Sequence, residues 1–257
     1  MKIGILDSGL GGLSVLHRAM LRFPGAEYLY YADRAHVPYG EKTPEEVMGY
    51  VRDALRFLEK QGAEAFVIAC NTATSVAAGQ MRQEFSQPII GMEPAIKLAL
   101  DRYPAGRVLA AATPITVRGE KMHALLDRWD GAHRSDLLAL PELVRFAERE
   151  EFSGEAVTTY LREQLRPYEL QNYCAFVLGC THFNYFKDSL RQLLPDGVHI
   201  LDGVDGTLSR LAACVAIPEN VSIVAPQFFD SGEIMSPPQR AEVETCLRRL
   251  DAMAEIE

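Results

Sequence analysis

The chain has 257 residues, of which 48% are hydrophobic and 24% charged, so it can form one large or two small globular domains. Its net charge of -9 and lack of a long Lys/Arg run argue against nucleic acid or an anionic membrane as a partner. The chain starts directly on a strand-like run and contains no 18-residue apolar stretch, so we expect neither secretion nor a membrane span. Five cysteines without a C-x-x-C pair indicate a reducing cytoplasm.

Short apolar runs alternate with helix-like stretches, which predicts an α/β protein with mainly parallel sheets flanked by helices. The expected strands are 2–7, 27–33, 65–70, 88–92, 107–113, 136–140, 174–179, 198–202 and 221–225. The clearest helix is 44–60, since Thr43 can cap it, Pro44 suits its first turn, Glu46 completes a capping box and Gly62 follows its end. Its expected buried stripe is Val47, Tyr50, Val51, Ala54, Leu55 and Leu58.

Two segments of the chain follow the same pattern: residues 65–72 read AFVIACNT and residues 175–182 read AFVLGCTH, with Ala, Phe, Val and Cys at matching positions. In both, an apolar run ends at a cysteine, Cys70 or Cys180, and a helix-like stretch follows. A thiol at such a turn lies near unpaired N–H groups and the positive end of a helix dipole, which favours the thiolate. The dipole contributes only about 0.3–1 kcal/mol, less than one pKa unit, so a further positive charge or hydrogen bond is needed.

The repeat predicts two pseudo-symmetric lobes with the active site in the cleft between them. Residues 1–96 plus 206–257 are expected to form one lobe, and residues 97–205 the other. Two matched thiols suit a reaction that needs one acid/base group on each face of the substrate. The alternative is a pair of buried structural cysteines.

A glycine-rich segment, Asp7-Ser8-Gly9-Leu10-Gly11-Gly12, follows the first strand and would let the backbone approach a small anionic ligand. It does not fit the dinucleotide pattern G-x-G-x-x-G, because Ser14 stands at the third glycine position. A lysine-containing phosphate loop is also absent from the sequence. We therefore expect no nucleotide cofactor.

Two further segments offer hydrogen-bonding groups. The turn Pro38-Tyr39-Gly40 carries an aromatic hydroxyl and backbone amides, although an ordinary loop explains it equally well. Thr113 and Thr116 follow another strand, where their hydroxyl groups can bind a carboxylate or simply cap a helix.

The sequence Cys180-Thr181-His182 combines two zinc-ligand types, but no second His/Cys pair lies nearby, so we expect no metal site. His182 is interpreted as an acid/base helper of Cys180, and Asp7 as the counterpart for Cys70. A carboxylate beside a thiol raises the pKa of that thiol, so Asp7 suits a proton-relay role better than stabilisation of a thiolate. A buried histidine with satisfied hydrogen bonds is the alternative for His182.

These motifs together resemble the cofactor-independent aspartate/glutamate racemase family. The resemblance extends from the first strand to about residue 205. The segments that carry it are Asp7-Ser8-Gly9-x-Gly11-Gly12, Pro38-Tyr39-Gly40, Cys70-Asn71-Thr72-Ala73, Gly91-Met92-Glu93-Pro94-Ala95, Thr113-x-x-Thr116-Val117 and Gly179-Cys180-Thr181-His182.

The resemblance implies interconversion of L- and D-glutamate by two cysteines, without pyridoxal phosphate or metal, to supply D-glutamate for peptidoglycan. Cys70 and Cys180 would exchange protons with the substrate, assisted by Asp7, His182 and Glu148. It also implies a homodimer. The substrate-binding residues implied are Asp7, Ser8, Pro38, Tyr39, Gly40, Asn71, Thr72, Thr113, Thr116, Thr181 and His182.

Two alternatives stay open from the sequence. One is an aspartate racemase, or a related isomerase or decarboxylase of a small dicarboxylic acid. The other is a non-catalytic protein that binds an amino acid between two lobes, for which replacing either cysteine would leave ligand affinity largely intact.

Overall fold

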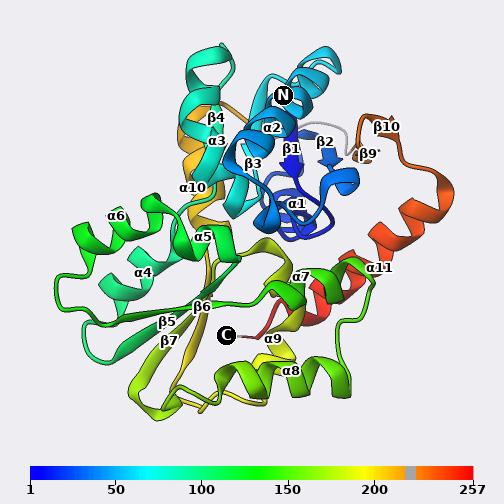
Figure 1. Ribbon diagram of the computed structural model, residues 1–257. Helices are drawn as coiled ribbons and strands as arrows, with labels where there is room; N and C mark the ends of the chain where they lie inside the picture. The colour runs from blue at the N-terminus through cyan, green and yellow to red at the C-terminus, as the bar shows by residue number, and fades with distance from the viewer. Residues whose placement is uncertain (218–223, 257) are drawn as a thin grey trace.

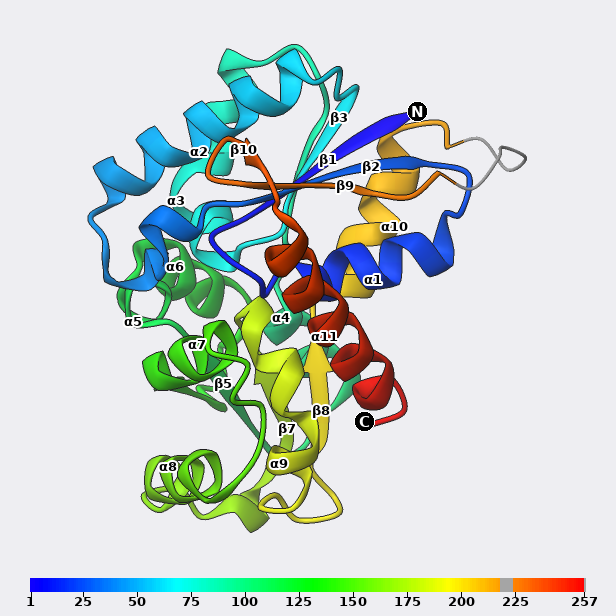
Figure 2. The same cartoon turned by 90° about the vertical axis from the view of Figure 1, so that its right-hand side faces the viewer.

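The computed structural model describes residues 1–217 and 224–256 and shows two sheets, each flanked by helices (Figures 1 and 2). Within these residues, one sheet has the strand order β10-β9-β2-β1-β3-β4 and the other the order β6-β5-β7-β8. We call the part around the first sheet lobe A and the part around the second lobe B. The predicted α/β fold with two lobes and mainly parallel sheets is confirmed.

The strands and helices alternate along most of the chain. The described strands are β1 (Lys2–Asp7), β2 (Glu27–Ala32), β3 (Ala65–Ile68), β4 (Ile89–Gly91), β5 (Arg107–Ala112), β6 (Ser135–Ala139), β7 (Tyr173–Leu178), β8 (His199–Asp202), β9 (Gln227–Asp230) and β10 (Glu233–Ile234). The described α-helices are α1 (Leu13–Arg22), α2 (Pro44–Lys60), α3 (Asn71–Glu84), α4 (Ala95–Arg102), α5 (Pro114–Arg118), α6 (Glu120–Trp129), α7 (Pro141–Glu148), α8 (Glu155–Leu165), α9 (Lys187–Arg191), α10 (Val204–Cys214) and α11 (Pro237–Met253). Short 3₁₀ turns are η1 (Arg34–His36), η2 (Tyr39–Glu41), η3 (Leu170–Asn172) and η4 (Thr181–Phe186).

Buried apolar strands explain the parallel pairing. In lobe A, β1 pairs in parallel with both β2 and β3, and only the pair β9–β10 among the described strands is antiparallel. In lobe B, β5 and β7 are the inner strands of a parallel sheet. Apart from their first residues, β1 and β2 are buried along their whole length, as expected for parallel strands covered by helices on both faces.

The helix predicted from capping residues is observed over the predicted range. The Thr43 hydroxyl accepts from the Glu46 N–H, and the Glu46 carboxylate accepts from the Thr43 N–H, forming the capping box. Gly62 takes a positive φ of 88° beyond the helix end. Of the predicted buried stripe, Tyr50 is only half-buried, because its ring stacks on the His36 ring with centroids 3.8 Å apart.

Other predicted boundaries differ by one or two residues. Both cysteine-bearing strands end before the cysteine, so that β3 stops at Ile68 and β7 at Leu178. Of the strand predicted at 221–225, residues 221–223 lie outside the described residues, and the following strand, β9, starts at Gln227.

The chain passes between the lobes after β4 and again after β8. Helix α4 packs on the sheet of lobe B, whereas α10 packs on β4 and α1 of lobe A. Helix α11 contacts both α1 and η4 and therefore lies against both lobes (Figure 2). The domain boundaries at 96/97 and 205/206 stay a proposal.

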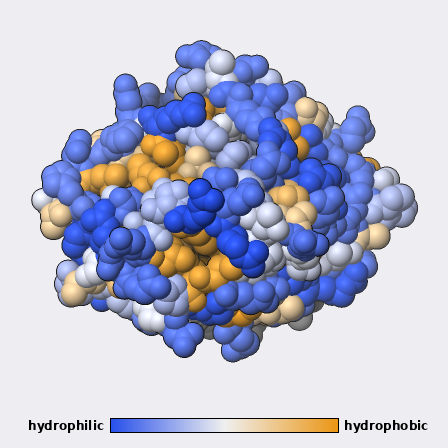
Figure 3. Space-filling model, turned by 60° about the horizontal axis from the view of Figure 1, so that its bottom comes forward, coloured by the Kyte–Doolittle hydropathy of each residue, from blue (hydrophilic) through white to orange (hydrophobic). Residues whose placement is uncertain are grey.

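Apolar side chains fill a large core cluster that runs through both lobes and smaller clusters around α2–α3 and α4. The surface on the lobe B side is largely hydrophilic, with apolar side chains gathered in a few patches (Figure 3). No helix among the described residues is long and apolar enough to span a membrane.

Candidate active site

The carboxyl ends of parallel strands from both lobes carry the candidate catalytic groups. Asp7 is the last residue of β1, Cys70 follows β3 and Cys180 follows β7. Both thiols are buried, each 6% exposed. Ligands of α/β proteins commonly bind at this edge of a sheet.

The Cys70 thiol lies in a hydrogen-bonded but strongly buried position. Its sulfur accepts from the Ala73 N–H at 3.5 Å, as the N-cap of α3, and its thiol donates to the Ser8 hydroxyl at 3.8 Å. Burial raises the pKa of Cys70 to about 12, and the neighbouring charges of Asp7 and Cys180 also act to raise it. In this state Cys70 is therefore a neutral thiol near pH 7.

The Cys180 thiol lies against an imidazole. The Cys180 sulfur is 3.7 Å from His182 Nδ1, and His182 Nε2 is 2.6 Å from Glu148 Oε1. Burial lowers the pKa of His182, but hydrogen bonds to Cys180 and Glu148 outweigh it and raise that pKa well above its ordinary value. An imidazolium that donates to both neighbours is the form that this geometry favours.

Asp7 joins the two lobes at the site. Its Oδ1 accepts from the Gly9 N–H at 2.9 Å, and its Oδ2 accepts from the Thr181 hydroxyl of lobe B at 3.0 Å. Burial raises the pKa of Asp7, partly offset by the charge of His182 and the Gly9 hydrogen bond. Its raised pKa suits a group that exchanges protons.

The glycine-rich segment packs on these functional side chains. A Cβ at Gly9 would lie 2.1 Å from Glu148 Oε1, and one at Gly11 would lie 2.4 Å from His182 Nδ1. At Gly12 it would lie 2.5 Å from the Asp7 Cβ. The nearest neighbours of these glycines are thus side chains of the protein itself, so their small size lets the two lobes meet at the site.

Three threonine hydroxyls form a second polar cluster across the lobes. Thr72 Oγ1 lies 2.8 Å from Thr113 Oγ1 and 3.3 Å from Thr116 Oγ1, and the last two are 3.0 Å apart. Thr113 also packs on Gly40, because a Cβ added at Gly40 would lie 2.7 Å from the Cβ of Thr113. Although Thr113 is the N-cap residue of α5, its side chain makes no capping hydrogen bond.

The remaining predicted site residues lie beside these clusters. Tyr39 is buried, and its hydroxyl donates to Asp33 Oδ2 at 2.6 Å. Pro38 is half-buried and follows a cis peptide bond. Asn71 is half-buried and, with Thr116, lines a cavity of about 350 Å³ between the lobes.

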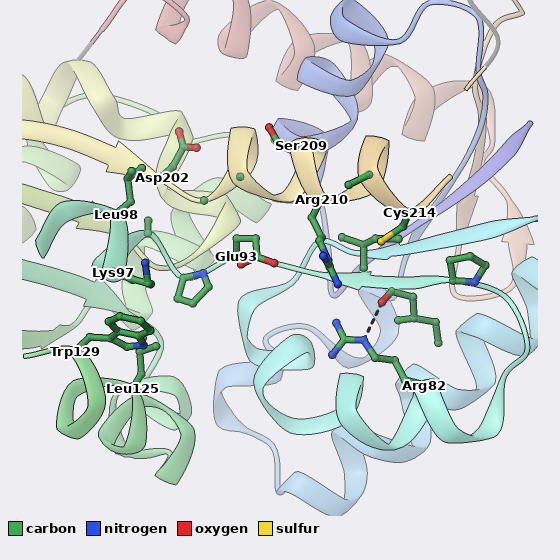
Figure 4. Close-up of a pocket in the computed structure, with 18 of the residues that line it drawn as sticks. Arg82, Glu93, Lys97, Leu98, Leu125, Trp129, Asp202, Ser209, Arg210 and Cys214 are labelled. Atoms are coloured by element: carbon green, nitrogen blue, oxygen red, sulfur yellow. Dashed lines mark hydrogen bonds between the residues drawn. The ribbon is translucent and has the colours of Figure 1, made fainter. Parts of the chain in front are cut away.

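A larger pocket of about 1110 Å³ lies where the chain passes between the lobes. Figure 4 shows Arg82 and Arg210 on its lobe A side and Trp129 beyond Glu93 on the other side. Neither thiol is among the described residues that line it. This pocket is therefore separate from the two thiols.

Sequence reasoning missed several groups that hold the site in place. The hydroxyls of Tyr30 and Tyr185 donate to the carbonyls of Gly9 and Leu10 at 2.7 and 2.6 Å. Arg34 approaches Glu148, with Nε 3.6 Å from Oε2. The two tyrosines read as ordinary core residues, whereas the position of Arg34 just after a strand was a usable signal.

Among the described residues, no group of three or more His, Cys, Asp or Glu side chains is arranged to hold a metal ion.

Comparison with known proteins identifies the family. A family model described as Asp/Glu/Hydantoin racemase matches residues 14–211. The glutamate racemase of Campylobacter curvus is 49% identical over 265 residues and covers 100% of both chains. That of Lachnospira eligens is 51% identical over 213 residues, covering 82% of this chain and 80% of its own.

Solved structures agree with this assignment. The glutamate racemase of Campylobacter jejuni is 26% identical, with a TM-score of 0.85 and 98% of each chain covered. The Escherichia coli glutamate racemase, solved with L-glutamate and the activator UDP-MurNAc-ala, is 29% identical, with a TM-score of 0.82 and 98% and 94% covered. The chain therefore belongs to the Asp/Glu racemase family and is an amino-acid racemase. The relatives just described are all glutamate racemases.

Proposed function

We propose that the protein interconverts L- and D-glutamate by cofactor-independent proton transfer between two cysteines. The observation that carries this proposal is the placement of Cys70 and Cys180 at matching strand ends of the two lobes, close enough for the charge of one to act on the pKa of the other. The names of the relatives support glutamate as the substrate.

In the proposed reaction, one cysteine as thiolate removes the α-proton from one face of glutamate. The C–H electron pair stays on the α-carbon as a carbanion, stabilised by the adjacent carboxylate. The other cysteine as thiol then donates its proton to the opposite face. The two sulfurs have exchanged protonation states, and the reverse reaction uses them in the opposite order.

The substrate supplies the positive charge that Cys70 lacks. The pKa of Cys70 is raised to about 12 without a ligand, so a thiolate there needs a nearby cation. The ammonium group of glutamate, bound between the cysteines, provides one. At Cys180 the His182 imidazolium, held by Glu148, has the equivalent role.

The polar groups around the thiols would hold the substrate carboxylates and ammonium. The proposed set combines hydroxyls, an amide, a carboxylate, an imidazole and turn backbone: Asp7, Ser8, Pro38, Tyr39, Gly40, Asn71, Thr72, Thr113, Thr116, Thr181 and His182. The half-buried Asn71 amide and the three-threonine cluster would bind a carboxylate.

The test follows the α-proton by NMR in D2O, together with optical rotation, for L-glutamate and separately for D-glutamate, without added cofactor. We expect both enantiomers to lose the α-proton and racemise. Cys70→Ala and Cys180→Ala should each abolish racemisation, whereas Cys214→Ala, a matched change of an exposed cysteine, should not.

The same experiment separates the alternative substrate. Exchange on aspartate but not on glutamate would keep the mechanism and replace the substrate. No exchange on either amino acid, with the protein folded, would overturn the proposed function.

We further propose that the enzyme acts in the cytoplasm as a homodimer and that its D-glutamate enters peptidoglycan. Gel filtration with light scattering tests the homodimer, since a protein that is monomeric at all concentrations would exclude it.

A further inference from the structure

The two carboxylate oxygens of Glu148 differ, because one of them has hydrogen-bond partners and the other has none among the described residues. Its Oε1 accepts from the Leu10 N–H at 2.7 Å and contacts His182 Nε2 at 2.6 Å. Its Oε2 is buried without a hydrogen-bond partner among the described residues. The cation that faces this oxygen is Arg34, at 3.6 Å.

Arg34 is itself held from outside the thiol site. It lies in η1, with its side chain 22% exposed, and its Nη1 donates to Glu242 Oε2 of α11 at 2.6 Å. The Asp230 carboxylate of β9 is 4.0 Å from the same nitrogen. Arg34 therefore connects Glu148 of lobe B to the C-terminal helix.

The charges along this line alternate in sign. The order is Cys180, the His182 imidazolium, the Glu148 carboxylate, the Arg34 guanidinium and the Glu242 carboxylate. The Glu148 carboxylate is only 12% exposed, and the cations that pair with the oxygens of a buried carboxylate fix its orientation. Arg34 and His182 flank Glu148 on its two oxygens.

We propose that Arg34 is a positioning residue for the Cys180 side of the reaction, and that Glu242 fixes Arg34 in that position. Arg34 pairs with Oε2 of Glu148 and so keeps Oε1 aimed at His182, which holds the imidazolium against the Cys180 sulfur. Among the described residues, the hydrogen-bond partners of Cys70 are Ser8 and Ala73, and neither connects it to a charged side chain. The inference rests on the proposed function.

The test exploits the two directions of the reaction. The Cα–H bond of one enantiomer is broken by Cys180 and that of the other by Cys70. When the step at Cys180 becomes slower, the primary deuterium isotope effect on kcat rises for the first enantiomer and falls for the second. The enantiomers are equally stable, so kcat/KM must fall equally in both directions and cannot report this asymmetry.

The experiment measures racemisation of L- and D-glutamate deuterated at the α-carbon. Cys180→Ser and Cys70→Ser first establish which enantiomer belongs to each cysteine. We expect Arg34→Gln to lower kcat about tenfold, a part of the 10²–10⁴-fold that a general acid or base contributes, and to shift the isotope effects in the same sense as Cys180→Ser. Glu242→Gln should shift the isotope effects in the same direction as Cys180→Ser, but by less. Arg34→Lys should bring the isotope effects part of the way back to the wild-type values.

Arg18→Gln is the matched control, because Arg18 forms an Arg–carboxylate pair with Asp205 away from the thiols. It should leave both isotope effects as in the wild type. Thermal unfolding of each variant shows whether it is folded. If folded Arg34→Gln leaves the ratio of isotope effects unchanged, or shifts it as Cys70→Ser does, Arg34 has no positioning role. If the wild type does not act on glutamate, the proposed function has failed instead.

Discussion

The surroundings of Cys70 and Cys180 differ although their sequences are almost duplicated. Cys70 caps a 14-residue α-helix and accepts a backbone hydrogen bond from Ala73. Cys180 precedes a six-residue 3₁₀ helix that is buried throughout and receives no capping hydrogen bond. The imidazole of His182 lies beside Cys180, whereas the carboxylate of Asp7 acts on Cys70.

The difference teaches that a repeated strand end fixes where a thiol lies but not how its charge is stabilised. The cation beside Cys180 is the His182 imidazolium, paired with Glu148 of lobe B, which Arg34 contacts from lobe A. In the proposed mechanism, the cation for Cys70 arrives with the substrate. A racemase with equal activity in both directions can therefore be built from two unequal halves.

Removal of one thiol at a time is the strongest test of this comparison. We expect Cys70→Ala and Cys180→Ala each to lower racemisation about 10⁴-fold. The remaining cysteine still faces one side of the substrate, so each variant should slowly exchange the α-proton of one enantiomer with D2O, and the two variants should prefer opposite enantiomers. NMR measures this exchange, and the same preference in both variants would contradict the two-sided arrangement.

Replacement of the built-in cation is the next largest change. His182→Gln removes the positive charge beside Cys180 but keeps a hydrogen-bonding side chain, and we expect kcat to fall about 10²–10³-fold. Asp7→Asn, the matched change on the Cys70 side, should shift the isotope effects of the two enantiomers in the opposite sense. Isotope effects that move together in both variants would show that the two halves are not distinct.

The close packing of the glycine-rich segment can be tested through stability. Gly11→Ala places a Cβ 2.4 Å from His182 Nδ1, so we expect a loss of about 1–3 kcal/mol in the free energy of unfolding and lower activity. Gly49→Ala in α2 is the control, because nothing lies within 4 Å of its added Cβ. It should raise stability by about 0.5–1 kcal/mol. Thermal unfolding compares the two, and equal midpoints would refute the packing argument.

The raised pKa of Cys70 predicts that the stability of the protein falls at high pH. Its folded pKa is about 12, above its unfolded value, so the folded state binds the thiol proton more tightly. This contribution to stability is complete below the unfolded pKa of about 8.5 and decreases as the pH rises toward 12. Denaturant unfolding at pH 8 and pH 10.5 should show a smaller decrease for Cys70→Ala than for the wild type, with Cys214→Ala resembling the wild type.

Local sequence signals predicted much of the fold. The capping box from Thr43 to Glu46 defined α2 because both of its hydrogen bonds involve residues three positions apart. The apolar runs located the central strands because parallel strands are buried on both faces. Strand ends were less accurate, since the N–H of Ala69 still donates to the Leu6 carbonyl and that of Gly179 to the Ala111 carbonyl, although the regular strands end at Ile68 and Leu178.

The contacts between residues far apart in the chain were beyond sequence reasoning. His182 was recognised as a partner of Cys180 because it is two residues away, but its bond to Glu148 joins residues 34 positions apart. The glycine-rich segment was interpreted as a ligand loop, and its contact with His182 required the relative position of the lobes. The roles of these residues in catalysis and in substrate binding stay proposals.

The order in which the sheets are completed has a consequence for synthesis of the chain. The lobe B sheet comes from one continuous stretch, β5 to β8, whereas the lobe A sheet pairs β2 with β9, whose residues 227–230 are made near the end. We expect lobe B to fold on the ribosome while β2 still has an unpaired edge. Chains that stop before residue 227 would keep this edge exposed and would be prone to aggregate, so β9 protects the finished protein from aggregation as well as completing its fold.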